Sequence, residues 1–486
     1  MPMDTAGIGK ARNLVTMNTT PNSSPCPFHS GNVPPQAPLD AWPPGPPSGL
    51  TGWGLLWRMA RGMPEALVAW QREFGDVVHL RTWPEHQIVV ADPTLARELL
   101  VGNRDKLTRW ERARTVFRRM HGDSVLVAEG EAWQRKRMAL HPEFSRQAAH
   151  SFVPALTEIM DRAYAAWPQT DANWPIEQAF TSLAMELIVG MAFSDGMERD
   201  EARRTEQACR ALMAQADAEF YHPWSWPDWM PWQRARRQAQ AQLDQLIERR
   251  LLQRLAMPLA NRPDDLLSRL LRLHNDDQAN WPLSAVRAEC KTAFLAGHET
   301  VASTLTWWAW CMASHPDAQH AARAEVVETL GDAPPAASEL PALRYLSQTL
   351  QETMRLYPAA PVLISRRASC PVTLGHWRFP AGTLFLVPVQ LMHHDARWFP
   401  EPRAFRPERF RLDGDSKVAG AYQPFGSGPR VCLGQHLAQT EMTLAAAMLL
   451  QRFYLSVPDG MTPPQAVLHV TQRPAQPLRL ALRRAP

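Results

Sequence analysis

A glycine-rich loop near the end of the chain carries a single cysteine, in the segment Phe425-Gly-Ser-Gly-Pro-Arg-Val-Cys-Leu-Gly434. A helical pattern over 433–452 begins directly behind Cys432. A thiol at a helix start faces unpaired backbone N–H groups, which favour the thiolate. We expect Phe425 to shield the sulfur, Arg430 to meet an anion, and the loop glycines to adopt positive φ: Gly426, Gly428 and Gly434. The pattern indicates a thiolate metal ligand, with a buried structural cysteine as the alternative.

A second group of reactive side chains lies in the long apolar helical pattern over 283–314, in Ala296-Gly-His-Glu-Thr300. A glycine in mid-helix costs about 1 kcal/mol relative to alanine, so Gly297 needs a reason, and room for a small ligand is one. The Thr300 hydroxyl can bond back to the carbonyl of Ala296 and loosen that turn. Glu299 adds a group that can carry a proton. The alternative is a capping or solvent-facing Glu-Thr pair.

Taken together, the two motifs resemble the cytochrome P-450 family. The spacing F-x-x-G-x-R-x-C-x-G is similar to its haem-binding loop, and A-G-H-E-T is similar to its oxygen-activation motif. The resemblance implies haem b (iron protoporphyrin IX), with Cys432 as the thiolate ligand of the iron. It also implies Thr300 and Glu299 as the residues that deliver protons.

Further motifs follow in the family's order. Glu352-Thr-Met-Arg355 resembles the E-x-x-R motif, and the resemblance implies a structural ion network of these two residues with Arg409 of Phe405-Arg-Pro-Glu-Arg-Phe410. Trp133-Gln-Arg-Lys-Arg137 resembles the W-x-x-x-R helix that binds the haem propionates. Two other cations are candidates for the propionates, and Arg366 competes with the second: Arg430 and Arg367. The expected substrate pocket consists of the loop 110–128 and five apolar residues: Ala293, Ala296, Val301, Val362 and Leu363.

The elements that must position these residues are mostly helical. Apolar periodicity predicts helices over 64–74, 95–101, 131–139, 145–166, 176–193, 199–218, 231–255, 283–314, 316–330, 340–356 and 433–452. Short β-rich runs occur at 77–90 and 361–388. We expect a mainly α fold with a minor β region, the cytochrome P-450 fold, as one haem-containing catalytic domain over 41–486. Residues 1–40 are expected to form a flexible Pro/Ser-rich arm, and the Trp- and Pro-rich segment 221–232 a loop between two helices.

Composition limits the remaining classes of protein. The chain holds 52 Lys plus Arg against 48 Asp plus Glu, which disfavours a dedicated nucleic-acid binder. Its six cysteines form no C-x-x-C pair, which fits a reducing compartment. The longest apolar runs, such as 444–450, are shorter than the roughly 18 residues of a membrane span, and the N-terminus has no secretory pattern. We expect a cytoplasmic protein without a transmembrane anchor.

The resemblance implies a soluble, bacterial-type monooxygenase that inserts one oxygen atom of O2 into an apolar small molecule by hydroxylation, epoxidation or dealkylation. Electrons would come from a separate ferredoxin or flavodoxin with an NAD(P)H reductase, and we expect a monomer. Arg135 and Lys136 either face that acidic partner or form plain solvated surface. One alternative function is a peroxide-dependent peroxygenase or isomerase. Another is a non-catalytic haem-thiolate sensor, in which the Glu299-Thr300 pair would be superfluous.

Overall fold

A helix of 32 residues, α11 (Leu283–Ser314), runs through the middle of the helical region. Most of its side chains are buried, which is typical of a helix within a large core. Trp307 and Trp308 near its C-terminal end are fully buried. The structure is a computed structural model that describes residues 42–485 except 195, 221–225 and 412–419. Helix α11 carries one of the two predicted reactive motifs, so its packing determines the site.

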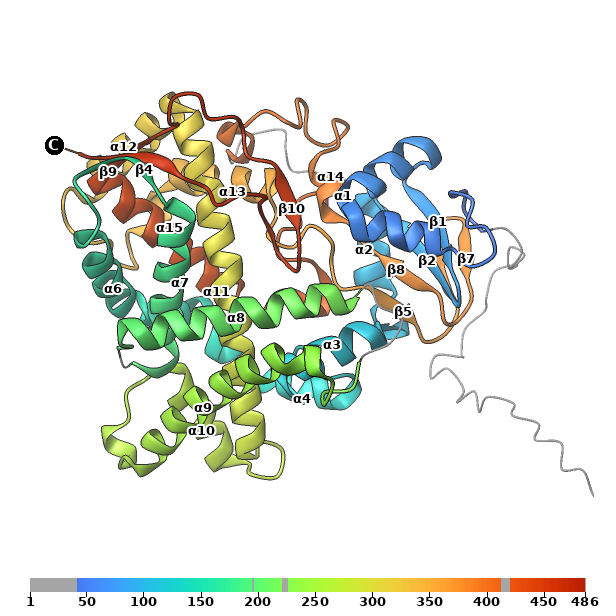
Figure 1. Cartoon of the computed structure of the whole chain (residues 1–486), viewed down its shortest axis with the longest axis horizontal. Coiled ribbons are helices and arrows are strands. Elements are labelled where there is room, and N and C mark those ends of the chain that lie inside the picture. The colour runs from blue at the N-terminus through green and yellow to red at the C-terminus, as the bar shows by residue number, and fades with distance from the viewer. Residues whose placement is uncertain (1–41, 195, 221–225, 412–419, 486) are drawn as a thin grey trace, which may run out of the picture. The chain divides into compact units, whose positions relative to one another are not determined.

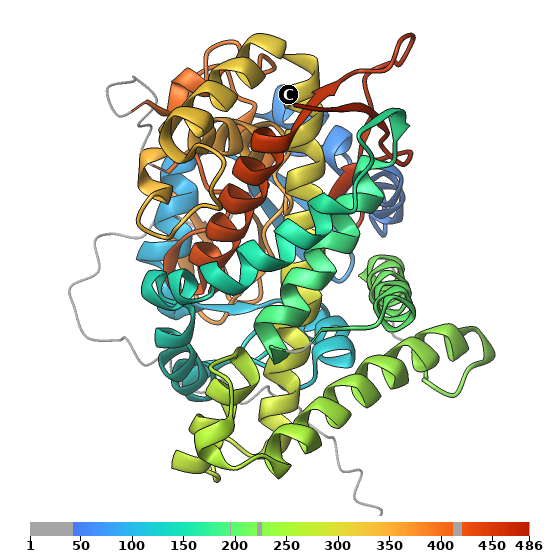
Figure 2. The ribbon, with the colours of Figure 1, turned by 90° about the vertical axis from the view of Figure 1, so that its left-hand side faces the viewer.

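The helices around α11 pack against it or against one another (Figures 1 and 2). Helix α7 makes the most extensive contact with α11, and α10, α13 and α15 also touch it. Helices α8 and α9 pack as a pair. The bounds of the longer helices are α1 Trp53–Phe74, α3 Glu111–His121, α4 Gly130–Leu140, α6 Val153–Ala165, α7 Ile176–Phe193, α8 Arg199–Phe220, α9 Arg234–Ala256, α10 Leu266–Asp276, α12 Pro316–Leu330, α13 Arg344–Leu356 and α15 Gln435–Arg452. Three short helices complete the set: α2 Pro93–Arg97, α5 Arg146–Ser151 and α14 Val389–His393.

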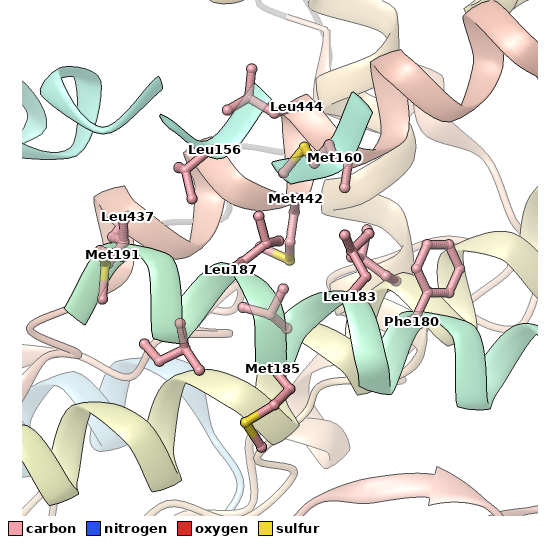
Figure 3. Close-up of a cluster of buried hydrophobic side chains, with 14 of the residues drawn as sticks. Leu156, Met160, Phe180, Leu183, Met185, Leu187, Met191, Leu437, Met442 and Leu444 are labelled. Atoms are coloured by element: carbon pink, nitrogen blue, oxygen red, sulfur yellow. The ribbon is translucent and has the colours of Figure 1, made fainter. Parts of the chain in front are cut away.

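The main core lies where α6, α7 and α15 meet. Figure 3 shows leucine, methionine and phenylalanine side chains of these helices interdigitating. Leu156 and Met160 come from α6, Leu183 and Leu187 from α7, and Met442 from α15; all five are almost completely buried. Burial of side chains of this size stabilises a fold by about 1.5–3 kcal/mol each. This packing holds α15, and with it the cysteine loop that precedes it, against the helical body.

A five-stranded sheet in the order β1-β2-β8-β5-β3 contains the β-rich runs. Its strands are β1 Val77–Thr82, β2 Glu85–Val90, β3 Leu107–Arg109, β5 Arg366–Ala368 and β8 Leu384–Leu386. Strands β2 and β8 are parallel, and the other neighbours are antiparallel. The register of β3 with β5 places Arg109 opposite Arg366. The smaller sheets are β4 Thr170–Trp174 with β12 Leu480–Arg484 and β9 Phe453–Ser456, β10 Ala466–Leu468 with β11 Gln472–Pro474, and β6 Val372–Leu374 with β7 Trp377–Phe379.

The predicted fold class, mainly α with a minor β region, is confirmed. Several boundaries were wrong. The predicted helix over 145–166 is two helices that meet before Pro154, and α1 starts at Trp53 rather than at 64. Helix α10 was not predicted. The segment 110–128, expected as a loop, contains α3, whose arginines hid an amphipathic pattern: Ala113, Val116 and Met120 form its buried face.

The described residues form one unit by their contacts. The predicted N-terminal arm 1–40 lies outside the described residues, as do residues 221–225 of the Trp-rich segment. Among the described helices, α7 alone is long and apolar enough to cross a membrane, and 61% of its apolar window is buried inside the protein. That burial is typical of a core helix.

Candidate functional site

The cysteine loop is closed by backbone hydrogen bonds. The N–H of Cys432 donates to the Phe425 carbonyl over 3.0 Å, and a 3-10 turn at Gly428–Arg430 follows the contour of the loop. Gly426 and Gly428 have φ of 75° and 73°, as expected. A side chain on Gly428 would lie 2.3 Å from the carbonyl oxygen of Leu100, so only glycine fits there. Gly434 differs from the prediction: its φ is −83°, and a side chain there would meet nothing within 4 Å.

Cys432 lies on the wall of an internal space. Its side chain is accessible to solvent, yet burial raises the pKa of its thiol. Solvent access and the burial effect on the pKa are compatible when protein atoms surround the thiol but leave a space on one side of it. The N–H of Gly434 donates to the sulfur and the charge of Arg137 acts on it; both oppose the rise in pKa. Helix α15 starts only at Gln435, not directly behind Cys432 as predicted. The thiolate must therefore be favoured by the Gly434 N–H and the charge of Arg137, together with a bound metal ion.

The predicted ion network lies beneath this loop. The Arg355 guanidinium donates to both carboxylate oxygens of Glu352, over 2.7 and 2.8 Å, and both side chains are fully buried. Arg409 donates to the same carboxylate over 3.2 Å. Arg355 also binds the carbonyls of His393, Pro402 and Ala404. The His393 ring in turn accepts the N–H of Gln423, just before the cysteine loop, so the network supports that loop.

The accessible face of α11 carries the second motif. Ala296 is exposed although Phe294, Leu295 and His298 beside it are buried, so this side of a central helix opens onto space that the protein does not fill. The Thr300 hydroxyl donates to the Ala296 carbonyl over 2.8 Å, which confirms the expected bond. The hydroxyl oxygen of Thr300 retains lone pairs that can accept a hydrogen bond from water in this space.

Gly297 and Glu299 have neighbours that the sequence did not reveal. A side chain on Gly297 would lie 3.1 Å from Ile188 Cδ1, so close packing of α11 on α7 is a reason for this glycine. Burial raises the pKa of the Glu299 carboxyl, and the nearby Thr471 side chain is the strongest effect that opposes the rise. Glu299 therefore faces the turn between β10 and β11, beside Thr300 in sequence but on another side of the helix.

Four arginines gather near the cysteine loop, from β3, α4, β5 and the loop itself: Arg109, Arg137, Arg366 and Arg430. Burial lowers the pKa of Arg366 and of Arg430 to about 10, and the charges of Arg366 and Arg137 also act on Arg430. Glu129 is the acid whose charge acts on Arg109, Arg366 and Arg430 together. The Arg430 guanidinium lies 4.1 Å from the ring centre of Trp133. The cluster holds more positive charge than Glu129 can match, which favours an anionic ligand.

The prediction of Arg367 as a member of this cluster was wrong. Arg367 donates to Glu85 over 2.7 Å with two nitrogens, and to Glu111 over 2.7 Å with Nε. Adjacent residues of a strand point to opposite faces, so these bonds leave Arg366 on the side of the cluster. Arg366 is buried, opposite Arg109 in the sheet, and replaces Arg367 as the candidate.

The sequence also missed two buried groups beside this cluster. Arg109 Nε and His121 Nδ1 have no hydrogen-bond partner among the described residues. Burial, together with the charges of Lys291 and Arg109, lowers the pKa of His121 to about 3, so the ring is neutral. Buried donors and acceptors normally have partners. No short motif marks either residue; their spatial association depends on the pairing of β3 with β5 and on the packing of α3.

The predicted pocket residues divide into two groups. Leu363 lies beside the cysteine loop, 3.5 Å from where a side chain of Gly426 would be, and Val362 is likewise only half-buried. Ala293 is half-buried on the same side of α11 as Ala296. Val301 is 2% exposed and part of the main core, so it packs the interior rather than lining the accessible face.

These features fit a haem. The accessible Cys432 provides an iron ligand, and the described residues contain no group of three or more His, Cys, Asp or Glu that would form a different metal centre. The unmatched arginines and the orphaned Arg109 Nε suit the two propionates. The exposed Ala296 shows that α11 also borders space that the protein does not fill.

Comparison with known proteins agrees with this geometry. The family model described as Cytochrome P450 matches residues 43–480. The chain is 32% identical over 428 residues to "Cytochrome P450 734A4" of Oryza sativa subsp. japonica, covering 80% of this chain and 78% of the relative. It is 29% identical over 414 residues to "Cyclooctat-9-en-7-ol 5-monooxygenase" of Streptomyces melanosporofaciens, covering 84% and 87% of the two chains. Both plant and bacterial proteins are thus among its relatives.

Proposed function

The chain belongs to the cytochrome P450 family of haem-thiolate monooxygenases, and from this we propose that it oxidises an apolar small molecule with electrons from a separate protein. The observation that carries the proposal is the accessible Cys432, surrounded by unmatched arginines and set in a loop that the Glu352–Arg355 network supports. The bound haem supplies the iron at which O2 is reduced.

The chain's own residues hold and orient the cofactor. The Cys432 sulfur binds the iron and receives a hydrogen bond from the Gly434 N–H. Arg109, Arg137, Arg366 and Arg430 neutralise the propionates, with Trp133 stacked on Arg430. Phe425 and Leu363 border the loop and keep its surroundings apolar. A buried, largely apolar setting strengthens each of these electrostatic contacts.

Thr300 and Glu299 deliver protons in this proposal. The bond of Thr300 to the Ala296 carbonyl fixes its hydroxyl on the accessible face of α11. Because burial raises the pKa of Glu299, its carboxyl retains a proton at higher pH than an exposed glutamate would. Such a carboxyl can give up a proton towards Thr300 and regain one from solvent.

The substrate is apolar in this proposal because the accessible face carries Ala293, Ala296, Val362 and Leu363. One relative is named as a 5-monooxygenase of cyclooctat-9-en-7-ol, which supports a small organic substrate. Addition of candidate fatty acids, terpenoids, steroids and aromatics, followed by the spin-state change of the haem spectrum, identifies the class.

The electron donor in this proposal is a ferredoxin or flavodoxin with an NAD(P)H reductase. Its docking surface includes the exposed Arg135 and Met138 on α4. The expectation that Lys136 also faces this partner was wrong, because its ammonium pairs with the buried Glu289. We propose a bacterial-type, cytoplasmic monomer; the spacing of the six cysteines, which form no C-x-x-C pair, supports a reducing compartment.

The test has two parts. The reduced, CO-bound protein should show the red-shifted Soret band for which the family is named, and Cys432→Ser should abolish it. A band that survives this substitution would refute the ligand assignment. Product formation with NADPH and surrogate ferredoxins is then compared with peroxide alone. Turnover with peroxide but with none of the electron donors would refute the monooxygenase function in favour of a peroxygenase.

A further inference from the structure

The segment 125–129, between α3 and α4, directs several arginines with its backbone. The carbonyl of Leu126 accepts from Arg109 Nη1, and the carbonyl of Val127 accepts from Arg114 Nε over 3.1 Å. The next carbonyl, that of Ala128, accepts from Arg430 Nη1 over 2.9 Å. Consecutive carbonyls of one short segment thus orient arginines that come from β3, α3 and the cysteine loop.

Glu129 completes this arrangement. One of its carboxylate oxygens accepts from Arg430 Nη2 over 2.6 Å, and the other accepts from the backbone N–H of Arg109 over 3.2 Å. A displacement of the segment would therefore move Arg109 and Arg430 together. The orientation of these two arginine side chains therefore depends on the contacts that hold the segment 125–129 in place.

A buried carboxylate of α11 fixes the segment. Both oxygens of Glu289 accept from the Val125 N–H, over 2.9 and 3.1 Å. The Lys136 ammonium lies 2.8 Å from Glu289 Oε1, with the two side chains 14% and 4% exposed. The ammonium also lies 5.1 Å from the ring centre of Trp281. Glu289 thus joins α11, α4 and the segment 125–129 at one point.

A buried ion pair is costly to form, since both charges lose their hydration. Apolar side chains of similar size would often stabilise a fold as well or better. The contact that apolar side chains could not replace is the one from Glu289 to the Val125 N–H. That bond gives the carboxylate a role beyond packing.

We propose that Glu289 is a positioning residue for the haem: it anchors the segment 125–129, whose carbonyls aim Arg109 and Arg430 at the propionates. Lys136 neutralises this anchor. The inference rests on the proposed role of the arginine cluster. It adds a residue of α11 that acts on the propionates only through the segment.

Another ion pair of α11 provides a matched control. Arg287, two residues before Glu289, pairs with Glu248 of α9, with an Nη2–Oε1 distance of 2.9 Å. Both of its side chains are more than a third exposed. This pair joins two helices but bonds to none of the arginines around the cysteine loop. Arg287→Leu therefore tests whether loss of any α11 ion pair releases haem.

The experiment compares haem transfer from the holoenzyme to excess apomyoglobin. In the double variant Lys136→Met/Glu289→Leu, apolar residues replace the pair, so the fold is retained while the Val125 N–H loses its acceptor. We expect transfer about tenfold faster than in the unaltered protein, in line with the effect of residues that support ligands indirectly. Hydrogen exchange at 125–129 should rise in the same holoenzyme. Glu289→Gln keeps an acceptor oxygen, so its rate of haem transfer should lie between those of the double variant and the unaltered protein. Arg287→Leu should transfer haem at the rate of the unaltered protein.

Two outcomes would overturn the inference. One is a folded double variant that retains haem and protects 125–129 as well as the unaltered protein. The other is an Arg287→Leu variant that releases haem equally fast. Arg366→Leu separates this inference from the proposed function. If Arg366→Leu releases haem and the double variant does not, only the role of Glu289 fails; if Arg366→Leu has no effect, the arginine cluster itself is wrongly assigned.

Discussion

Two clusters of buried charge lie next to the cysteine loop, and they differ in how completely their members are paired. In the first, Arg355 donates to both oxygens of Glu352 and to three backbone carbonyls. In the second, Arg109 has a nitrogen without a partner, and the shared acid Glu129 serves three arginines.

This difference in pairing distinguishes a cluster that supports the cysteine loop from a cluster that can bind a ligand. A buried group that has all its hydrogen bonds within the protein has nothing left to offer a ligand, so the Glu352–Arg355 cluster stabilises. A buried cation without a matching anion is costly, and it is tolerated where a ligand supplies the missing charge. The arginine cluster is therefore the one that we propose meets the cofactor, while the fully paired cluster supports the cysteine loop.

The largest effect should come from breaking the paired cluster. Arg355→Met leaves the Glu352 carboxylate buried without its main partner, and loss of one member of such a pair costs about 3–5 kcal/mol. We expect a much lower midpoint of urea unfolding, followed by circular dichroism, and little haem incorporated. An unchanged midpoint would show that this pair does not support the fold.

A buried acid on α15, Glu441, extends the comparison to an incompletely paired group, whose effect on stability depends on pH. Glu441 is 5% exposed, its Oε1 lacks a partner among the described residues, and burial raises its pKa from 4.5 to about 8. The folded state binds this proton more tightly than the unfolded state does. Stability should therefore fall as pH rises from about 4.5 to about 8, at up to ~1.4 kcal/mol per unit.

Glu441→Gln should remove this loss of stability. The variant should be more stable than the unaltered protein at pH 8, by up to a few kcal/mol, and nearly equal to it at pH 5. Thermal unfolding at the two pH values measures the difference. A difference between the two proteins that is the same at both pH values would contradict the prediction.

The incompletely paired arginine cluster should respond in haem binding rather than in folding. Arg366→Leu removes a buried cation that has few protein partners, so the unfolding midpoint should change little. Haem transfer to apomyoglobin should be about 10- to 100-fold faster, because the propionates lose a counter-charge. Unchanged transfer together with a large fall in stability would place Arg366 in the supporting class instead.

The smallest effect is expected one residue later in the same strand. Arg367→Leu breaks the partly exposed pairs with Glu85 and Glu111, which are worth about 0.2–1 kcal/mol each. Haem transfer should match that of the unaltered protein. If Arg367→Leu released haem as fast as Arg366→Leu, the assignment of the two arginines to opposite sides of the strand would be wrong.

The sequence predicted those parts of the site whose residues are close in the chain. The loop around Cys432, the bond of Thr300 to Ala296 and the Glu352–Arg355 pair all join residues within a few positions of one another. Predictions failed where the partner is remote. Arg367, Lys136 and Val301 were misplaced because Glu85, Glu289 and the main core lie far from them in sequence.

The family and the helical class followed from the sequence alone, because a glycine-rich loop and a periodic helix determine their own local geometry. Which cations gather beside the cysteine loop was decided only by the tertiary structure. Arg109, Arg137, Arg366 and Arg430 come from separate elements, and the facing of Arg366 depends on the register of β5 with β3. A shift of one residue in that pairing would exchange Arg366 and Arg367, because successive strand residues point to opposite faces.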